Sequence, residues 1–175
     1  MKKMALVFVA LFLFVSTATA QKGVMKVEPS LVIAFPQSGT NTGFGLNGTF
    51  FYGINEQIDL TGTIGYVTWS YDGFDANLST IPILFGGRYS FGDQGGFTPY
   101  ASAELGFHFM STSYPTYNYL TGASTTDSYS DTQFGLGLGG GAYYQIGNIT
   151  LDGNLQYNNM DGSYFSVEFG AVFGI

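Results

Sequence analysis

Apolar and polar residues alternate with a period of two along most of the chain, and the alternation is clearest in the last eleven residues. From Phe165 to Ile175 every odd-numbered position is apolar, whereas most even-numbered positions carry Ser, Glu or Gly. Because this is the period of a β-strand, the segment predicts a strand with two unlike faces. Such a strand would promote aggregation if it were unpaired in water. In a membrane barrel it pairs with the first strand and buries its apolar face in lipid.

The same alternation predicts eight strands, joined by connections that are short and long in turn. Short periplasmic turns and longer outer loops are typical of outer-membrane barrels, and an even strand number places both termini in the periplasm. The predicted fold class is all-β: an eight-stranded antiparallel transmembrane β-barrel of outer-membrane type, built as an up-and-down meander. The predicted strands cover about residues 24–35, 42–54, 58–71, 78–91, 97–110, 133–146, 149–158 and 164–175.

The charged residues indicate which face of these strands meets lipid. When each strand is aligned by its apolar positions, no charged residue falls on the apolar face. A charge facing lipid near the bilayer centre costs about 2–4 kcal/mol if it is basic and less if it is acidic, so a membrane barrel is expected to segregate its charges. The inward face should then carry a polar network. Its predicted members are Lys26, Glu28, Asp59, Arg88, Glu104, His108, Asp152 and Glu168.

A soluble eight-stranded barrel with an apolar interior would show the same alternation with its faces reversed. Its solvent face would then carry Gly135, Gly137, Gly139 and Gly141, which are poor strand formers. Facing inward in a narrow barrel, the same glycines would leave room for large side chains. Aromatic residues near the strand ends also match the interfacial girdles of membrane barrels. The sequence therefore favours the membrane barrel.

Two features depart from a simple barrel pattern. Val67, Trp69 and Tyr71 continue their strand with apolar residues on the wrong parity, which a bulge or a position above the membrane would explain. Prolines also occur inside predicted strands, although a closed barrel has no free edge to accommodate them. These prolines are Pro29, Pro82 and Pro99.

Residues 1–20 have the features of a secretory signal peptide. Two lysines precede an apolar run, residues 4–15, that is too short to span a bilayer, and residues 18–20 form an Ala-x-Ala cleavage site. The alternative is an uncleaved anchor, which the short run disfavours. We expect Sec-type export, signal cleavage and residence in the outer membrane of a Gram-negative bacterium, with residues 21–175 as the barrel domain.

Composition removes several classes of function. The chain has no cysteine, which excludes disulfides, thiolate metal sites and cysteine nucleophiles. Without residues 1–20 it holds three basic residues against twelve acidic ones, a net charge of −9. Nucleic acid is therefore not an expected partner, because binding phosphates requires clustered Lys and Arg. No segment after residue 20 is apolar for long enough to form a transmembrane helix. We expect no cofactor.

The chain resembles the small outer-membrane β-barrel domain family, the group around the OmpA-type, OmpX-type and OmpW-type barrels. The resemblance covers about residues 24–175 and is carried mainly by residues 81–91, residues 99–106 and the C-terminal strand. It implies outer-membrane lipid and the barrel-assembly machinery as partners. One departure is Ile175, which stands where the assembly signal of these barrels usually ends in an aromatic residue.

His108 is the only histidine, so any Ser-His-acid catalysis would require it. The lipid A deacylase family resembles the chain in size, but its His-x-Ser pair is not reproduced, because Ser111 falls on the opposite face from His108. Glu104 shares the inward face but lies four residues, or about 13 Å, along the strand. We expect a structural histidine, no enzyme activity, and no change in folding or phenotype on His108→Ala.

The inward charges raise the hypothesis of a channel. Eight strands enclose a lumen that side chains can fill, so an ion-pair network that braces the barrel is the preferred interpretation. Pairing the strands across a loop centred near residue 75 places Arg88 opposite Thr61 and diagonal to Asp59. The predicted bridge is Arg88–Asp59.

Residues 111–132 form the longest predicted loop, which we expect to lie outside the cell. Long loops often carry function, and tyrosines among small polar residues are typical of recognition surfaces. A solvated loop without function, or strands prolonged beyond the membrane, are the alternatives. Asp72 and Asp75 in another loop are too few for a good cation site. The candidate recognition residues are Tyr114, Tyr117, Tyr119 and Tyr129.

The predicted function is therefore that of an integral outer-membrane barrel with a structural or surface-interaction role, through adhesion or recognition by loop 111–132. The runner-up is a small transport barrel or narrow channel for small or apolar solutes. A lipid-modifying barrel enzyme ranks last.

Overall fold

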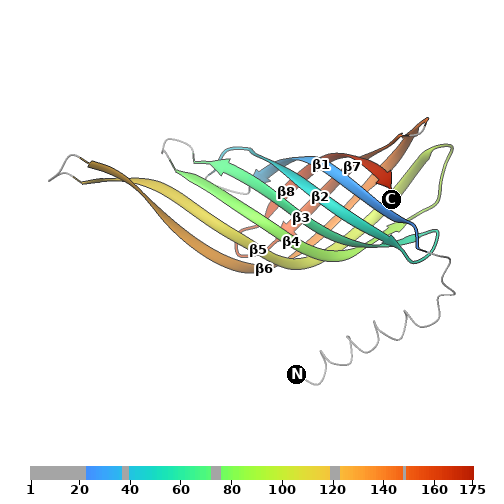
Figure 1. Ribbon diagram of the computed structural model, residues 1–175, viewed down its shortest axis with the longest axis horizontal. Coiled ribbons are helices and arrows are strands. Elements are labelled where there is room, and N and C mark those ends of the chain that lie inside the picture. Colours follow the sequence, from blue (N-terminus) through green and yellow to red (C-terminus); the bar gives the residue numbers. More distant parts are fainter. Residues whose placement is uncertain (1–22, 37–39, 72–75, 119–122, 148) are drawn as a thin grey trace, which may run out of the picture.

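The computed structural model describes residues 23–36, 40–71, 76–118, 123–147 and 149–175, and in these the chain forms one closed β-barrel (Figure 1). Each strand pairs antiparallel with the next along the chain, and β1 pairs with β8 to close the barrel. The predicted eight-stranded meander is confirmed. The strands are β1 (Met25–Pro36), β2 (Gly43–Gly53), β3 (Ile58–Ser70), β4 (Asn77–Ser90), β5 (Phe97–Asn118), β6 (Ala123–Ile146), β7 (Ile149–Asn159) and β8 (Tyr164–Gly174).

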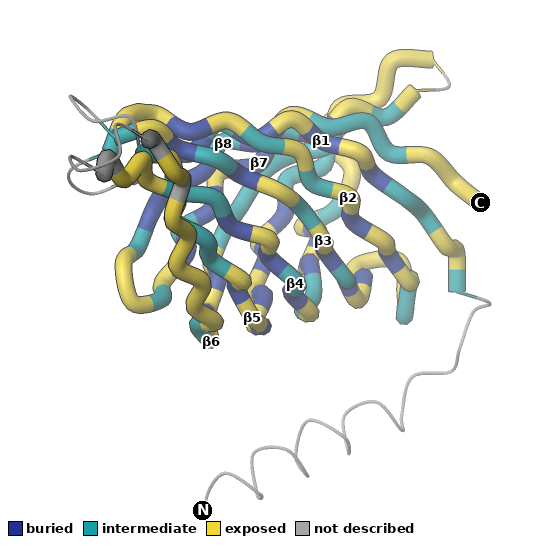
Figure 2. The backbone as a smooth tube through the Cα atoms, turned by 60° about the vertical axis from the view of Figure 1, so that its left-hand side comes forward, coloured by how far each residue is buried: buried dark blue, intermediate teal, exposed yellow. Residues whose placement is uncertain are grey.

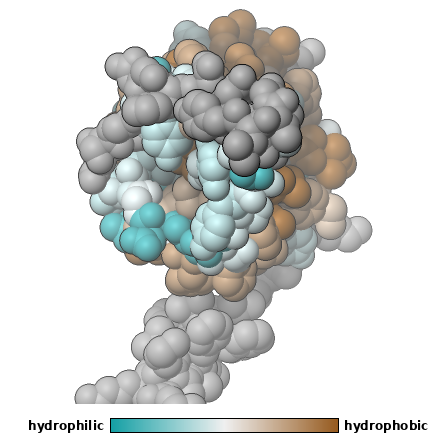
Figure 3. All heavy atoms as spheres, turned by 90° about the vertical axis from the view of Figure 1, so that its left-hand side faces the viewer, coloured by the Kyte–Doolittle hydropathy of each residue, from teal (hydrophilic) through white to brown (hydrophobic). Residues whose placement is uncertain are grey.

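The outer surface of the barrel wall is apolar and the lumen is polar. Phe44, Phe85 and Phe134 are more than 60% exposed, whereas the inward Glu28, Arg88 and His108 are at most 4% exposed. Burial alternates residue by residue along the strands (Figure 2), and apolar residues gather on the sides of the barrel (Figure 3). The parity read from the sequence is therefore the parity of the folded barrel. No helix among the described residues is long and apolar enough to cross a bilayer.

The three strand prolines lie where a strand ladder is interrupted or has ended, so their missing N–H groups cost little. The β1–β8 pairing runs through Val27↔Phe173 and resumes at Ser30↔Gly170, which leaves Pro29 in the gap. The β3–β4 pairing is interrupted in the same way opposite Pro82. Pro99 precedes Tyr100, where the β4–β5 pairing ends.

The predicted loop 111–132 is wrong in its bounds, because most of it is strand. The β5–β6 ladder continues from Met110↔Asp131 to Asn118↔Ala123. The resulting hairpin projects beyond the rest of the barrel, at the end opposite the C-terminus and the start of β1 (Figure 1). Alternating Ser, Thr and Tyr residues form strands well, since β-branched and aromatic side chains suit extended backbone. The alternative interpretation, in which the two strands are prolonged, is therefore correct.

The apolar residues at the end of β3 need no bulge. The β2–β3 register is continuous from Phe44↔Thr68 to Gly53↔Asp59, so Val67 and Trp69 keep the inward parity. Both are at most 4% exposed. The lumen therefore changes from polar to apolar toward the end from which the β5–β6 hairpin projects, which we call the outer mouth. The buried cluster there consists of Val32, Ala34, Val67, Trp69 and Tyr164.

Candidate functional site

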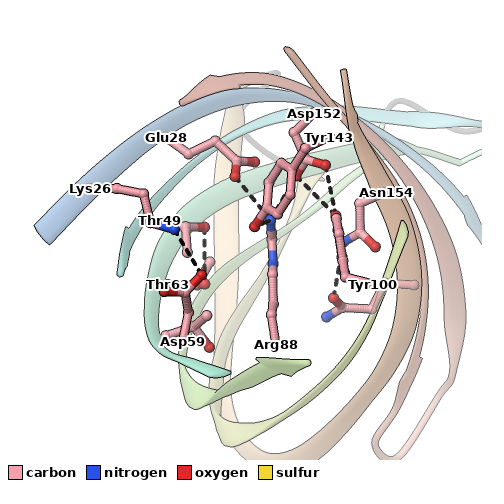
Figure 4. A network of polar contacts seen from close by, with 12 residues as sticks. Lys26, Glu28, Thr49, Asp59, Thr63, Arg88, Tyr100, Tyr143, Asp152 and Asn154 are labelled. Carbon is pink, nitrogen blue, oxygen red and sulfur yellow. Dashed lines mark hydrogen bonds and ion pairs between the residues drawn. The ribbon is translucent and has the colours of Figure 1, made fainter. Parts of the chain in front are cut away.

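The lumen contains a polar network centred on Arg88, which projects inward from β4 (Figure 4). Its Nη1 atom donates to Asp152 Oδ2 at 2.7 Å and to Glu28 Oε2 at 3.1 Å. These carboxylates come from β7 and β1, so a single guanidinium links three parts of the barrel wall. All three side chains are at most 5% exposed. Charges this deeply buried require compensating partners, which the ion pairs supply.

Aromatic rings enclose the Arg88 guanidinium. Its Cζ atom lies 4.6 Å from the ring centroid of Tyr100, 4.8 Å from that of Phe51 and 5.7 Å from that of Tyr143. Tyr143 also accepts a hydrogen bond from Nη1 at 2.9 Å, and Tyr100 donates to both carboxylate oxygens of Asp152 at 2.9 Å. Cation–π attraction is strongest where water is excluded, as it is here. Phe51 was missed by the sequence reading, although its position on the polar parity between Phe50 and Tyr52 was a signal.

The predicted Arg88–Asp59 bridge is wrong. Asp59 lies directly opposite Arg88 in the β3–β4 ladder, two residues from the predicted register. Its carboxylate pairs instead with Lys26 Nζ at 2.8 Å, at the end of the barrel where β1 begins. The Arg88 guanidinium points into the lumen, where it pairs with Glu28 and Asp152. The short Asp59 side chain pairs with Lys26 at the rim of the barrel.

A second polar layer lies around Glu104 on β5. Its Oε1 accepts hydrogen bonds from Thr61 at 2.9 Å and Thr63 at 3.0 Å, and Gln156 donates to its Oε2 at 3.4 Å. From Gln156 a chain of hydrogen bonds runs on to Glu168 on β8. Its links are Gln156–Asn158, Asn158–Ser166 and Ser166–Glu168.

The glycines of β6 make room for this interior. A Cβ on Gly141 would lie 2.5 Å from the Tyr100 hydroxyl, and one on Gly137 would lie 2.5 Å from Gln156 Nε2. A Cβ on Gly135 would lie 2.9 Å from His108 Cδ2. Real Cβ contacts are longer than these, so only glycine fits unless neighbours move.

His108 lies above the polar layers and close to the apolar cluster. It is 1% exposed, its ring meets that of Tyr164 edge-on at 6.4 Å, and its Nδ1 has no hydrogen-bond partner among the described residues. No hydroxyl nucleophile is hydrogen-bonded to it within the described part of the chain, so the geometry gives it no activated serine. Its burial also revises the expectation for His108→Ala, since removing the ring would leave a cavity.

The filled lumen leaves little space for a solute. The void between Arg88, Glu104 and Glu168 has a volume of about 10 Å³, which is room for about one water molecule. Within the described residues, no group of three or more His, Asp or Glu side chains is arranged to hold a metal ion. The arrangement therefore suits bracing of the barrel better than conduction or metal binding.

At the outer end, the structure places three of the four candidate recognition residues, Tyr114, Tyr117 and Tyr129, on the projecting hairpin. Tyr114 is 45% exposed and Tyr129 is 67% exposed. Tyr117 lies in β5, but its side chain is outside what the structure describes, and Tyr119 lies wholly outside the described residues. The hairpin is braced by Thr116, whose hydroxyl donates to Asp127 at 2.8 Å. Asp72 and Asp75 are also outside the described residues.

The sequence reading missed an open cavity of about 390 Å³ at the outer mouth. Trp69, Tyr71 and Thr80 line it from the β3–β4 side, and Met160 and Tyr164 line it from the β7–β8 side. The signal available in the sequence was the apolar Trp69 and Tyr71, which lie on the parity that was expected to be polar.

Comparison with known proteins identifies the fold. The family model described as "Outer membrane protein beta-barrel domain" matches residues 5–173. No curated protein matches the chain. A major outer membrane protein from Thermus thermophilus has a similar structure, with a TM-score of 0.66 and 13% identity over 89% of this chain and 100% of that one.

Two further solved structures are similar. Neisserial surface protein A (NspA) has a TM-score of 0.53 and 21% identity, over 86% of this chain and 94% of that chain. Ail, the attachment invasion locus protein of Yersinia pestis, has a TM-score of 0.54 and 13% identity, over 87% and 95%. At these identities the likeness concerns the fold alone.

Proposed function

The chain belongs to the outer membrane protein beta-barrel domain family, and from that premise we propose that this outer-membrane barrel is a surface-interaction protein whose contact element is the β5–β6 hairpin. The observation that carries the proposal is the length of this hairpin. β5 has 22 residues and β6 has 24, whereas the other strands have 11 to 14. A bilayer requires only about 9–11 residues per strand, so the extra length projects outward.

The projecting part of the hairpin offers free strand edges. The β4–β5 pairing reaches only Ser113 and the β6–β7 pairing begins only at Leu136. Beyond these residues, β5 and β6 pair with each other alone among the described strands. Their outer edges can therefore add a partner strand, a common mode of peptide recognition. The exposed Tyr114 and Tyr129 add rigid aromatic contact area.

The charge of the hairpin limits the kind of partner. Residues 111–132 contain Asp127 and Asp131 but no Lys or Arg. Ail has been observed in complex with the heparin analogue sucrose octasulfate. A polyanion of that kind would be repelled here, because Arg88 is buried and Lys26 lies at the opposite end of the barrel. We therefore assign the hairpin a neutral or basic partner, such as a protein segment or an uncharged polysaccharide.

The transport alternative finds less support. A solute would have to pass the layers around Arg88 and Glu104, where hydrogen-bonded side chains fill the lumen. A Ser-His-acid mechanism would need a hydroxyl nucleophile bonded to His108, and among the described residues no hydroxyl makes that bond.

The test measures attachment of cells that express the protein to surfaces coated with gelatin, dextran or heparin. In one variant an Asn-Gly turn replaces residues 114–127, joining Ser113 to Ser128, which already pair across the hairpin. In a second, Tyr114→Ser and Tyr129→Ser remove the exposed rings. We expect both to reach the outer membrane and to lose attachment to gelatin or dextran.

The matched control is Ser128→Ala with Ser130→Ala, which changes two exposed positions of the same hairpin without removing an aromatic ring. It should attach like the wild type. Equal attachment by wild type and the shortened hairpin, or attachment to heparin alone, would contradict the proposal.

A further inference from the structure

The two free edges of the projecting hairpin differ in length (Figure 1). On β5 the free edge spans residues 114–118, because β4 pairs with β5 only as far as Ser113. On β6 the free edge spans residues 123–135, because β7 begins to pair at Leu136. Along all of this length β6 pairs with β5 in one unbroken register, so no bulge turns the β6 edge away from a partner.

Two backbone hydrogen bonds identify the residues whose N–H and C=O groups point to these edges. Gln145 N donates to Gly96 O at 2.8 Å, so the odd-numbered residues of β6 face β5. Because neighbouring residues of a strand face opposite edges, the even-numbered residues within 124–134 present their backbone groups to the free edge. On the other strand, Phe91 N donates to Pro99 O at 2.9 Å. The odd-numbered residues of β5 therefore face β4 and, where β4 has ended, the free edge.

The β5 edge is protected against pairing and the β6 edge is not. Pro115 is an odd-numbered residue of β5, so it lies at an edge position and has no N–H to offer there. Proline on an edge strand is one of the means by which proteins prevent pairing with other chains. Residues 123–135 of β6 contain neither proline nor lysine. The longer and unprotected β6 edge is thus the one suited to accept a further strand.

The side chains along the β6 edge define the charge of the strand that fits it. Asp127, Tyr129 and Asp131 alternate along β6, so they lie on one face, and all three are exposed. The two carboxylates accept hydrogen bonds from the Thr116 hydroxyl and the Thr132 N–H, which carry no charge. Neither carboxylate forms an ion pair within the described part of the chain. Both negative charges are therefore available to a partner.

From this edge and its two carboxylates we propose, building on the surface-interaction role above, that β6 binds an extended basic polypeptide segment as an added antiparallel strand. Residues that pair directly across such a ladder have Cβ atoms about 4.5–5.5 Å apart. The segment that fits has Lys or Arg opposite Asp127 and Asp131, and an apolar residue opposite Tyr129. Its basic residues are thus four positions apart, and this pattern reads the same in both chain directions.

A second copy of the chain fits the β6 edge poorly. Its own hairpin would bring Asp127 and Asp131 to the contact, and like charges across a sheet are destabilising. Without residues 1–20 the chain has a net charge of −9, which adds repulsion between copies at longer range. An uncharged polysaccharide offers neither a backbone ladder nor a positive charge. The edge therefore favours a basic polypeptide over both.

The probe is the peptide Thr-Lys-Thr-Val-Thr-Lys-Thr, blocked at both ends and labelled with a fluorophore. Its binding to the full barrel, refolded in vesicles of zwitterionic lipid, is followed by fluorescence anisotropy. The control peptide Thr-Lys-Lys-Val-Thr-Thr-Thr has the same composition, but its adjacent lysines point to opposite faces of a strand. We expect saturable binding of the first peptide and about fivefold weaker binding of the control, which makes only one of the two ion pairs.

Variants of the barrel separate the edge from its charge. Ser130→Pro removes an N–H from the free edge of β6 without removing a hydrogen bond to β5, and should weaken binding by about tenfold or more. Ser130→Ala keeps the N–H and should bind like the wild type. Asp127→Asn with Asp131→Asn keeps the edge but removes both charges, and should weaken binding by about tenfold and reduce its dependence on salt.

A modified peptide tests the ladder on the wild-type barrel, where no variant has to fold. N-methylation of the two threonines beside the valine removes the N–H groups that face β6, so saturable binding should be lost. Equal binding of the methylated and unmethylated peptides, or of the two lysine arrangements, would show charge attraction alone and overturn the proposed strand addition. Cells that attach to gelatin or dextran through a barrel that binds neither peptide would also overturn it, while the surface-interaction role would stand.

Discussion

The Nη1 atom of Arg88 on β4 lies 2.7 Å from Oδ2 of Asp152 on β7, although two strands separate β4 from β7 in the barrel wall. The bond therefore crosses the lumen instead of following the wall. With Glu28 on β1 as a second partner at 3.1 Å, Arg88 ties together strands that have no ladder in common.

Arg88→Ala should destabilise the barrel by about 3–5 kcal/mol, because it leaves Glu28 and Asp152 buried without their counter-charge. The measurement is the unfolding of the protein by urea in lipid vesicles, together with the temperature at which its gel mobility shifts. Lys26→Ala provides the matched control, since it also removes one basic partner of an ion pair. The Lys26 side chain is 27% exposed, so its loss should cost only about 1 kcal/mol or less. Equal effects of the two variants would show that Arg88 does not brace the lumen.

Removing the central cation should also open a leak with a definite ion selectivity. The wild type should show no steady conductance in planar bilayers, because the void beside Arg88 measures only about 10 Å³ and leaves no open path for ions. Arg88→Ala combined with Tyr100→Ala removes two of the largest side chains from this layer. The leak should favour cations, since Glu28, Asp152 and Glu104 remain in the lumen.

The reversal potential in a salt gradient measures that selectivity. Adding Glu104→Gln to the leaky variant should shift the reversal potential toward zero. An anion-selective leak, or steady conductance by the wild type, would contradict the filled-lumen interpretation.

The sequence was sufficient to predict the barrel, because lipid allows only one parity for charge and a barrel has no edge at which to relax that rule. The same rule identified the inward residues one by one. It could not specify their partners, because partners are set by register and side-chain reach. The predicted Arg88–Asp59 pair shows this: a register wrong by two residues led to the wrong bridge, and the true partners lie on strands that are not adjacent.

The outer end was predicted less well for a different reason. Above the membrane, charge parity no longer constrains the strands, so a polar segment such as residues 111–132 suits a loop or a ladder equally well. Val67 and Trp69 seemed to violate the parity because the lumen was assumed to be polar throughout. In the structure both residues keep the inward parity, and the lumen around them is apolar instead of polar.

Gly141→Ala should destabilise the barrel by about 1–3 kcal/mol, because the new methyl group would contact the Tyr100 hydroxyl and the Gly153 carbonyl oxygen. Gly153→Ala on the adjacent strand is the matched control. A Cβ there has no atom within 4 Å, and alanine suits a strand better than glycine, so stability should be unchanged or slightly higher. Urea unfolding in vesicles compares the two. If Gly141→Ala is as stable as Gly153→Ala, the close packing of β6 against Tyr100 is not needed for the fold.

His108→Ala should lower the free energy of unfolding by about 1–3 kcal/mol while leaving the closed barrel intact. The ring is 1% exposed and contacts Tyr164, so its removal creates a hole beneath the Trp69 cluster, yet it breaks no described hydrogen bond of Nδ1. Trp69 fluorescence should shift slightly, because its neighbour Tyr164 loses support. His108→Gln keeps most of the volume and should recover part of the lost stability. A structural histidine predicts that attachment through the hairpin is unchanged in both variants. Loss of a lipid-modifying activity in His108→Ala, at unchanged stability, would instead assign His108 a catalytic role.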